Sequence, residues 1–375
     1  MSLVFYRKYR PKTFSEIVGQ EHVVQTLTNA LLSNSVSHAY LFCGPRGSGK
    51  TTIARLVAKS VNCEKIKGYE PCNKCSSCLE IMKGSSMDLV EIDAASHRGI
   101  DEIRELKEGI KFGPAKSKKK VYVIDECHQL SKDAANALLK ILEEAPEHAM
   151  FVLATTEAHK MIPTIISRCQ RFDFRKLSVN EIVKRLEVIA KKENLKFEKE
   201  ALELIASNSE GAIRDAESLL GQVFSFVYGG DSDKEVKAKD ISDLLGLVET
   251  GLVASMVDLF ISKKHGEALN YLNEINTKGK DIHEFAKHLT SYLRKCLILK
   301  IVGPTDKKSA LIQSILTGLT DEDFDKMKKQ ADSLTKDDLK RSLDLLIEAQ
   351  VKMKTAVIPQ LPLELAIIEI MGITG

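Results

Sequence analysis

The fold of this chain is decided by one stretch of sequence, Gly44-Pro45-Arg46-Gly47-Ser48-Gly49-Lys50-Thr51. It matches G-x-x-x-x-G-K-[ST], the pattern of loops that wrap nucleotide phosphates. An apolar run at residues 39–43 stands before it, and residues 52–58 follow with helical spacing. A strand, a glycine-rich loop and a helix are the context that this pattern requires. A chance match by an ordinary glycine-rich turn is therefore the weaker interpretation.

The residue types in this loop suit the binding of ATP. Glycines allow the backbone to turn its N–H groups inward, where they form an anion-binding nest at the positive end of the following helix. Lys50 adds a positive charge for the β- and γ-phosphates, and Thr51 offers a hydroxyl group to Mg²⁺. We therefore expect ATP and Mg²⁺ as cofactors at this loop.

Composition places the chain among ordinary globular proteins of two or three domains. It has 375 residues, of which 43% are hydrophobic and 29% are charged. No apolar run reaches membrane-spanning length, and residues 1–7 do not resemble a secretory signal, so we expect no membrane association and a cytoplasmic location. A net charge of +3 is too small to indicate nucleic-acid binding by itself.

Short apolar strands alternate with amphipathic helices through the first half of the chain. Strands are predicted at residues 39–43, 88–93, 120–125 and 150–155, and helices at residues 21–32, 52–58, 100–110 and 134–142. This alternation predicts an α/β fold, a parallel sheet with helices on both faces. Because ligands bind at the carboxyl ends of such strands, Gly44, Asp125 and Thr156 should meet at one edge. Pro11 argues against a helix in the basic, aromatic segment 6–14.

Two adjacent carboxylates, Asp125 and Glu126, follow the third of these strands. Asp125 would hold Mg²⁺ through water, and Glu126 would position or deprotonate the attacking water. A predicted strand lies between this pair and the phosphate loop, which argues against a simple kinase. Thr155 or Thr156, after the next strand, could orient the water or sense the γ-phosphate. Two β-branched residues that merely finish a strand are an equally good interpretation.

Two arginines occupy positions from which they could reach a nucleotide. Arg168 follows a short helical stretch after Pro163 and could act on the ATP of a neighbouring subunit. Spacing alone favours a surface salt bridge for this residue. Arg214 stands at the start of a predicted helix, where a surface role is equally plausible.

Four of the eight cysteines fall within a short segment, and they predict a metal site. Their spacing is C-x₈-C-x₂-C-x₂-C, formed by Cys63, Cys72, Cys75 and Cys78. Four thiolates suit tetrahedral Zn²⁺ without an open position, so the site should be structural rather than catalytic. The alternative, four scattered buried thiols, is weakened by the close spacing.

From Ser178 onward the pattern changes to helices alone. Ser178 and Glu181 have the spacing of a capping box, which marks the start of a helix. Residues 228–233 are rich in glycine and aspartate and predict a loop. Beyond Lys239 the chain is again helical, and it contains no catalytic motif.

The order of these motifs resembles the clamp-loader ATPases of the AAA+ class, and most closely the gamma/tau family of bacterial DNA polymerase III. The phosphate loop and the four cysteines are followed by DECH at 125–128, LATT at 153–156, SRC at 167–169 and GAIRD at 211–215. Further similar segments are YRPKTF at 9–14, VGQ at 18–20, EIDAAS at 91–96, NALLK at 136–140 and PQLPLEL at 359–365. The cysteine insert is the most specific mark, because most relatives in the wider class lack it.

The resemblance implies roles for specific positions. Lys50 and Thr51 would bind phosphate and Mg²⁺, and Asp125 and Glu126 would serve metal and water. The first sensor would be Thr156 rather than Thr155, the finger acting on the next subunit would be Arg168, and the second sensor would be Arg214. The implied nucleotide-binding set comprises Arg10, Pro11 and Val18 around the adenine, the loop from Gly44 to Thr51, Thr52 and Arg214.

The resemblance also implies the organisation and activity of the chain. Residues 1–177 would form the ATP-binding core with its zinc insert at 63–78, residues 178–240 a helical lid, and residues 241–375 a helical collar for oligomerisation. Members of the family load a ring-shaped sliding clamp: ATP binding closes a spiral of subunits on DNA, and hydrolysis releases the clamp. We expect a DNA-stimulated ATPase that belongs to a polymerase holoenzyme but makes no phosphodiester bonds itself.

The expected partners are other clamp-loader subunits, further copies of this chain joined through the collar, the sliding clamp, and primer–template DNA faced by Arg98 and Lys140. The extension by which longer family members reach polymerase and helicase is expected to be absent. One alternative is another AAA+ DNA motor, for branch migration or helicase loading. A second is a non-hydrolysing subunit that uses ATP only as a structural switch.

Overall fold

A computed structural model of the chain describes residues 4–96, 100–227, 235–244, 250–303 and 321–373. The chain divides into two compact units. The first unit comprises Met1–Phe197 with Ile205–Lys234, and the second comprises Glu198–Leu204 with Glu235–Gly375.

The first unit is built on a sheet of five parallel strands in the order β2-β3-β4-β1-β5. Their bounds are β1 Ala39–Cys43, β2 Leu89–Asp93, β3 Lys120–Asp125, β4 Ala149–Thr155 and β5 Gln170–Asp173. In the register of the sheet, Cys43 lies beside both Thr155 and Asp173, and Asp93 lies beside Asp125. The carboxyl ends of the strands therefore meet at one edge, and the predicted parallel α/β fold is confirmed.

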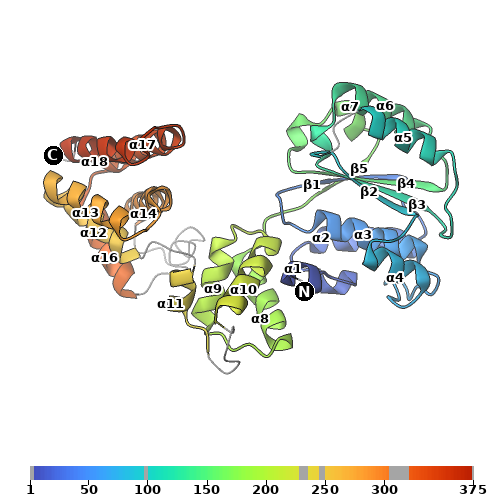
Figure 1. Ribbon diagram of the computed structural model, residues 1–375, viewed down its shortest axis with the longest axis horizontal. Coiled ribbons are helices and arrows are strands. Elements are labelled where there is room, and N and C mark those ends of the chain that lie inside the picture. Colours follow the sequence, from blue (N-terminus) through green and yellow to red (C-terminus); the bar gives the residue numbers. More distant parts are fainter. Residues whose placement is uncertain (1–3, 97–99, 228–234, 245–249, 304–320, 374–375) are drawn as a thin grey trace. The chain divides into compact units, whose positions relative to one another are not determined.

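Helices cover both faces of this sheet (Figure 1). One face carries α2 Glu21–Leu32, α3 Lys50–Asn62 and α4 Ser76–Lys83, and the other carries α5 Ile100–Ile110, α6 Lys132–Glu143 and α7 Pro163–Ile166. Side chains alternate along β1, because Tyr40 and Phe42 pack with Ile53 of α3 whereas Leu41 packs with Leu138 of α6. This alternation is the period-two pattern of a strand that is buried on both faces.

Two short elements of the first unit lie outside the sequence predictions. In β5 only Phe172 is buried, and an edge strand with one inward side chain has little periodic signal. The helix α1, Phe5–Lys8, forms in the segment where Pro11 is expected to oppose one, so that expectation is wrong. The helix ends at Lys8, and Arg10 is the residue that precedes Pro11. The proline therefore restricts where the helix ends and does not prevent it.

Two helices after the sheet complete the first unit. They are α8 Val179–Lys192 and α10 Ile213–Val227, with α9 Lys199–Asn208 between them in sequence. The predicted capping box is confirmed, because the Ser178 hydroxyl accepts from the Glu181 N–H and the Glu181 side chain accepts from the Ser178 N–H. On α10, the Phe224 ring lies 5.4 Å from the Phe5 ring of α1.

The second unit consists mainly of helices packed around one apolar core. Those around this core are α12 Thr250–Ser262, α13 His265–Thr277, α14 Ile282–Val302, α16 Asp321–Ser333, α17 Lys336–Met353 and α18 Leu361–Ile373, whereas α11 Ala238–Leu244 contributes no described residue to it. Phe260, Leu272, Phe285 and Leu346 are fully buried in this core. Among the described residues, none of the helices combines the length and the apolar character needed to cross a membrane.

One buried carboxylate anchors the segment between α5 and β3 to the start of β2. Asp88 is 3% exposed, and its oxygens accept from the backbone N–H groups of Ala115 (2.6 Å), Lys116 (3.0 Å) and Ser117 (2.8 Å). Burial by itself raises the pKa of Asp88, but these N–H donors outweigh burial and hold the pKa below its ordinary value. The ionised carboxylate therefore stabilises the folded state.

Replacing this carboxylate should destabilise the first unit in a pH-dependent way. We expect Asp88→Asn to lower the free energy of unfolding by roughly 2–3 kcal/mol at pH 7, because charge-assisted hydrogen bonds are lost. The folded-state pKa is depressed, so the stabilisation is fully present above the ordinary pKa of about 3.9 and is lost as pH falls through the lower folded-state value.

The measurement is urea unfolding of the wild type and the variant over a series of pH values. The difference between them should shrink below about pH 3.9. Glu147→Gln, at an exposed carboxylate of the same unit, is the matched control and should change little. A difference that stays constant down to the acid limit would contradict the role given to the charge.

Candidate functional site

The glycine-rich loop after β1 is held close to the sheet by its backbone. The Gly44 N–H donates to the Thr155 carbonyl oxygen at 3.1 Å. A Cβ atom at Gly44 would lie 2.5 Å from the Phe174 carbonyl oxygen, and its φ of +151° is unfavourable for other residues. A Cβ at Gly47 (φ +75°) would lie 2.9 Å from the Cβ of Ala212, so this loop also approaches the start of α10. Both glycines therefore allow a close approach of backbone.

Lys50 begins α3 and is nearly buried, with 6% of its surface exposed. Its ammonium group donates to the carbonyl oxygens of Gly44 (2.7 Å) and Pro45 (2.9 Å). Burial lowers the pKa of Lys50, and the negative charges of Glu126 and Asp125 oppose that shift. The ammonium group is thus a buried positive charge whose closest partners are neutral carbonyls, which is the condition in which an anion binds well.

The predicted acidic pair lies across from the start of α3. The Thr51 hydroxyl donates to Oδ2 of Asp125 at 2.8 Å, so a hydroxyl and a carboxylate come together as Mg²⁺ ligands would. Glu126 has a φ of +47°, an uncommon backbone conformation that is often found at functional sites. Its Oε2 accepts from the Thr156 hydroxyl at 2.8 Å. Thr156, and not the buried Thr155, therefore contacts Glu126.

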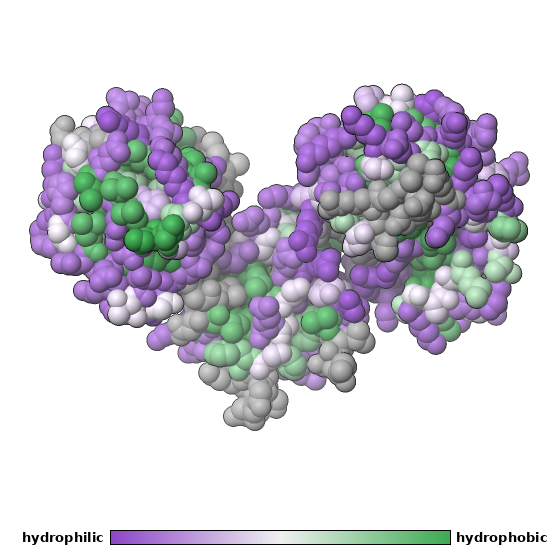
Figure 2. Space-filling view, turned by 45° about the horizontal axis from the view of Figure 1, so that its top comes forward, coloured by the Kyte–Doolittle hydropathy of each residue, from purple (hydrophilic) through white to green (hydrophobic). Residues whose placement is uncertain are grey.

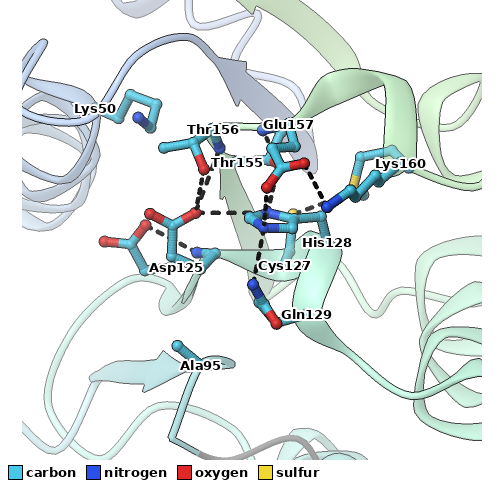
Figure 3. A network of polar contacts seen from close by, with 12 residues as sticks. Lys50, Ala95, Asp125, Cys127, His128, Gln129, Thr155, Thr156, Glu157 and Lys160 are labelled. Atoms are coloured by element: carbon cyan, nitrogen blue, oxygen red, sulfur yellow. Dashed lines mark hydrogen bonds and ion pairs between the residues drawn. The ribbon is translucent and has the colours of Figure 1, made fainter. Parts of the chain in front are cut away.

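A histidine joins these groups to a second carboxylate (Figure 3). The His128 side chain is 3% exposed, and its Nδ1 lies 3.0 Å from the Thr155 hydroxyl and 3.5 Å from Oε2 of Glu126. Its Nε2 lies 3.2 Å from the Gln129 amide and 3.5 Å from Oε1 of Glu157. Both ring nitrogens of His128 therefore have polar neighbours. Glu126 is contacted by Thr156, which follows β4, and by His128, which lies in the turn after β3.

The phosphate loop opens into a cavity of about 470 Å³ in the first unit. The predicted site residues that line this cavity are Arg10, Pro11, Val18, Arg46, Gly47, Ser48, Gly49, Lys50, Thr51, Thr52, Asp125, Glu126 and Arg214. The cavity is within the size range of small-molecule sites. Residues from the N-terminal segment, the phosphate loop, the acidic pair and α10 are therefore brought to one place.

Arg214 of α10 contacts Tyr6, a residue that is not among the predicted site residues. Its guanidinium carbon lies 4.7 Å from the ring centroid of Tyr6, and a hydrogen bond with Arg214 lowers the pKa of Tyr6. Tyr6 lines the same cavity. Sequence patterns cannot reveal this contact, because more than two hundred residues separate the two side chains.

A buried ion pair in the wall of the cavity is also missed by the sequence predictions. Nε of Arg185 on α8 lies 3.0 Å from Oε1 of Glu217 on α10, and both side chains are less than 10% exposed. Burial raises the pKa of Glu217, while the charge of Arg185 opposes that shift. A signal is present in the sequence, because Arg185 lies three residues after Ile182 on the apolar face of α8.

Four residues of the predicted nucleotide site do not line the cavity. Gly44 and Pro45 contribute the carbonyls that hold Lys50, and Thr156 acts through its contact with Glu126. Arg168 forms a salt bridge with Glu143, and its Nη1 donates to the Thr164 carbonyl oxygen at 2.8 Å. The spacing argument for a surface salt bridge agrees with this geometry. Arg98 lies outside the described residues.

The four clustered cysteines come together between α3 and α4. Their sulfur atoms lie within 4.8 Å of one another. The Cys72 N–H donates to the Cys63 sulfur at 3.3 Å, and the N–H groups of Lys74 and Cys75 donate to the Cys72 sulfur at 3.5 and 3.3 Å. Those two donors lower the pKa of Cys72 to about 6, whereas burial raises the pKa of Cys78. A cluster of four thiols with N–H donors to sulfur is consistent with a structural zinc site.

Comparison with protein families gives a consistent result along most of the chain. A model described as the delta subunit of DNA polymerase III matches residues 19–178. A model of the ATPase lid domain of the DNA polymerase III clamp-loader subunit matches residues 181–229. Domain III of the DNA polymerase III subunits gamma and tau matches residues 236–374.

Individual relatives are similar over most of this chain. It is 42% identical to the DNA polymerase III subunit tau of Bacillus subtilis over 365 residues, which are 97% of this chain and 62% of that protein. The chain thus spans less than two thirds of that relative. It is 44% identical over 299 residues to the DNA polymerase III subunit gamma of Buchnera aphidicola, a match that covers 80% of each chain.

Among solved structures, the RuvB Holliday junction branch migration motor of Thermotoga maritima aligns with a TM-score of 0.48 and 20% identity, over 67% of this chain and 79% of that chain. This likeness does not distinguish one function from another. The identity to the tau subunit of Bacillus subtilis extends over 97% of this chain. The chain belongs to the gamma/tau family of DNA polymerase III clamp-loader subunits.

Proposed function

We propose that this chain is an ATP-hydrolysing motor subunit of a clamp loader, which places a sliding clamp on primed DNA in the bacterial cytoplasm. One observation carries the proposal: a single cavity collects the phosphate loop, the acidic pair and an arginine of the lid. Each of these groups has a defined task in the transfer of a phosphoryl group. The gamma and tau names of the relatives support the clamp-loader part.

Nucleotide binding follows from the charges and the backbone of the loop. The N–H groups at the start of α3 and the ammonium group of Lys50 are positioned for the phosphates. Lys50 would exchange its neutral carbonyl partners for a phosphate oxygen, and this exchange compensates the burial of its charge. Arg10, Pro11 and Val18, which line the same cavity, would contact the adenine.

Hydrolysis depends on the groups around Glu126. Mg²⁺, held by Thr51 and by Asp125 through water, would supply charge stabilisation for the phosphates. Glu126 would orient or deprotonate the attacking water, and the Thr156 hydroxyl that contacts it would hold the carboxylate in place. Arg214, which approaches from α10, would sense the γ-phosphate and link the nucleotide to the lid.

Arg168 would complete the site of the neighbouring subunit. It does not line the cavity of its own chain, and its present partner is the carboxylate of Glu143 on α6. Its side chain is 33% exposed, so it is available at the surface of the unit. An arginine of this kind would add transition-state stabilisation only after subunits assemble.

An apolar face on the second unit supports assembly through a collar. Figure 2 shows hydrophobic residues gathered on one side of this unit. Its exposed large apolar side chains include Ile347 and Val351 of α17, Val357 and Ile358 of the connection, and Leu361, Leu365 and Ile368 of α18. Spacings of three and four residues place them on one face of each helix. We propose that the collar of another clamp-loader subunit, including a second copy of this chain, packs on this face.

The remaining proposals concern the zinc insert and the domain limits. The four cysteines would hold one structural Zn²⁺ that fixes α4 against α3. Residues 1–177 would form the core, residues 178–240 the lid and residues 241–375 the collar, and Lys140 would contact DNA. The intact set of Lys50, Asp125, Glu126 and Arg214 favours a hydrolysing motor over a structural switch.

ATP hydrolysis by the assembled complex tests the proposed function. We expect the rate to rise when primed DNA and the clamp are both added, because each selects the closed spiral of subunits. Lys50→Ala should abolish ATP binding and clamp loading, measured by nucleotide filter binding and by retention of labelled clamp on primed circular DNA. Lys111→Ala, at an exposed lysine outside the cavity, is the control. Clamp loading by Lys50→Ala would overturn the motor assignment.

The finger role of Arg168 predicts a defect that appears only in the complex. Arg168→Ala should leave ATP affinity unchanged but lower the assembled rate by about 10³-fold or more, the range typical of arginine fingers. Arg171→Ala, at a surface arginine paired with Asp173, is the matched control. A variant complex that hydrolyses ATP at the wild-type rate would show that Arg168 acts elsewhere.

The cysteine cluster predicts about one zinc ion per chain. Elemental analysis should find this zinc in the native protein and should find little in Cys72→Ser/Cys75→Ser. The melting temperature of the first unit should be lower in this variant than in the wild type, because metal binding contributes to folding. Cys169→Ser, at a thiol outside the cluster, should keep the metal. A stable wild-type protein without metal would refute the site.

The apolar collar face predicts a loss of association without a loss of nucleotide binding. Val351→Asp/Leu365→Asp should prevent assembly with companion subunits in analytical ultracentrifugation, because burying two carboxylates in an apolar interface is unfavourable. ATP affinity should remain at the wild-type value. Ile301→Asp, at an exposed apolar residue of α14, is the control. Normal assembly of the double variant would exclude this face.

A further inference from the structure

A second cavity in the first unit has a volume of about 450 Å³. It lies between the N-terminal segment, the outer side of α3 and the end of α4. Six of its twelve lining residues are cationic: Arg7, Arg10, Lys12, Arg55, Lys59 and Lys83. None of the lining residues is acidic. So many like charges around one cavity are unfavourable unless an anion joins them.

The carboxylates around this cavity neutralise only part of its charge. Arg55 pairs with Glu91, and its Nε lies 2.5 Å from Oε1 of Glu91. Lys59 is 3% exposed and donates to the Lys12 carbonyl oxygen at 2.9 Å and to the Asn73 side chain. In the described part of the chain, the side chains of the other four cations form no ion pair with a carboxylate.

Arg10 shows the effect of this imbalance most directly. Burial lowers its pKa, and the positive charge of Arg55 lowers it further. Among the described residues its guanidinium group forms neither a hydrogen bond nor an ion pair. A guanidinium group carries five N–H donors, and that of Arg10 is half-buried. An anion with several oxygens would supply the hydrogen-bond acceptors that these donors lack.

The cavity also has an apolar part. Leu56 and Ile81 are each 1% exposed at its floor, and Met82 and Pro11 lie at its margin. No aromatic side chain lines it. Sites for single-stranded DNA combine a positively charged track with aromatic rings on which bases stack. A compact cavity with clustered cations and no aromatic ring fits a small anion better than a strand.

We propose that this second cavity binds a small anion that carries two or more linked phosphate groups, either free polyphosphate or the phosphates of a nucleotide. The phosphates would lie among Arg7, Arg10, Lys12 and Lys83. A nucleoside, where one is present, would rest on Leu56 and Ile81. The site is distinct from the phosphate loop, because Lys12, Arg55, Lys59 and Lys83 do not line the first cavity.

The two cavities are coupled through their common wall. Arg10, Pro11 and Thr52 line both of them. An anion that draws Arg10 toward the second cavity changes the contacts available in the first, and the effect of each ligand on the other is reciprocal. This consequence rests on the proposed binding of ATP in the first cavity, whereas the anion site itself does not.

Calorimetric titration of the full chain with inorganic tripolyphosphate tests the site. The first cavity is saturated beforehand with a non-hydrolysable ATP analogue and excess Mg²⁺, so that only a second site can respond. We expect one additional binding event per chain. In Lys12→Ala/Lys83→Ala the affinity should fall at least tenfold, because two exposed cations that line only the second cavity are removed.

Lys111→Ala/Lys118→Ala removes two exposed cations that lie outside both cavities, and it should bind like the wild type. Circular dichroism and an unchanged affinity for the ATP analogue show that each variant is folded. A parallel titration with guanosine diphosphate distinguishes the sources: tighter binding than tripolyphosphate identifies a nucleotide, and weaker binding identifies free polyphosphate.

Three results would overturn the proposal. The first is the absence of tripolyphosphate binding once the first cavity is saturated. The second is equal affinity of the two double variants for tripolyphosphate. The third is binding of a ten-nucleotide oligothymidylate that requires Lys12 and Lys83, in the absence of tripolyphosphate binding. That result would assign the cavity to a DNA strand. Because none of these readouts uses hydrolysis, they remain separate from a failure of the motor assignment.

Discussion

The parallel register of β3, β4 and β1 is the constraint on which the first cavity depends. It places Cys43 beside Thr155 and Ile124 beside Leu153, so the phosphate loop and Glu126 leave the sheet at the same level. The 2.8 Å contact between Thr156 and Glu126 spans two neighbouring strands. A slip of one residue would shift one of these groups by about 3.3 Å along the strand. The separation of the two oxygens would then exceed hydrogen-bonding distance. The apolar layers on both faces prevent that slip, because it would also reverse every side chain of a strand.

The features that could be predicted from the sequence are those encoded by residues close together in the chain. The phosphate loop, the acidic pair, the four cysteines and the capping box at Ser178 and Glu181 each occupy a short segment. Their spacing reflects a local geometry, such as a turn or a close cluster of four thiols, that depends little on the rest of the fold. The parallel sheet could also be predicted, because short apolar strands that alternate with amphipathic helices are typical of a sheet covered on both faces.

The features that could not be predicted arise from contacts between distant segments. The Arg185–Glu217 pair, the Tyr6–Arg214 contact and the three N–H donors around Asp88 all join separate elements. Their residues are common types in ordinary positions. The packing of α8, α10 and α1 gives a role to the first two contacts. The packing of residues 115–117 against the start of β2 gives a role to Asp88. β5 is a different case, because an edge strand with one buried side chain lacks the alternation on which strand prediction relies.

The two arginines of the proposed site differ in a way that bears on assembly. Arg214 is held within the cavity wall by Tyr6, whereas Arg168 rests at the surface in a salt bridge with Glu143. Exposed ion pairs of this kind contribute roughly 0–1 kcal/mol, so a phosphate of higher charge could displace Glu143 at little cost. The Arg168 side chain is therefore held by Glu143, but the ion pair that holds it is weak. A side chain that is paired within its own chain and released at little cost would suit the role proposed for Arg168 at the site of a neighbouring subunit.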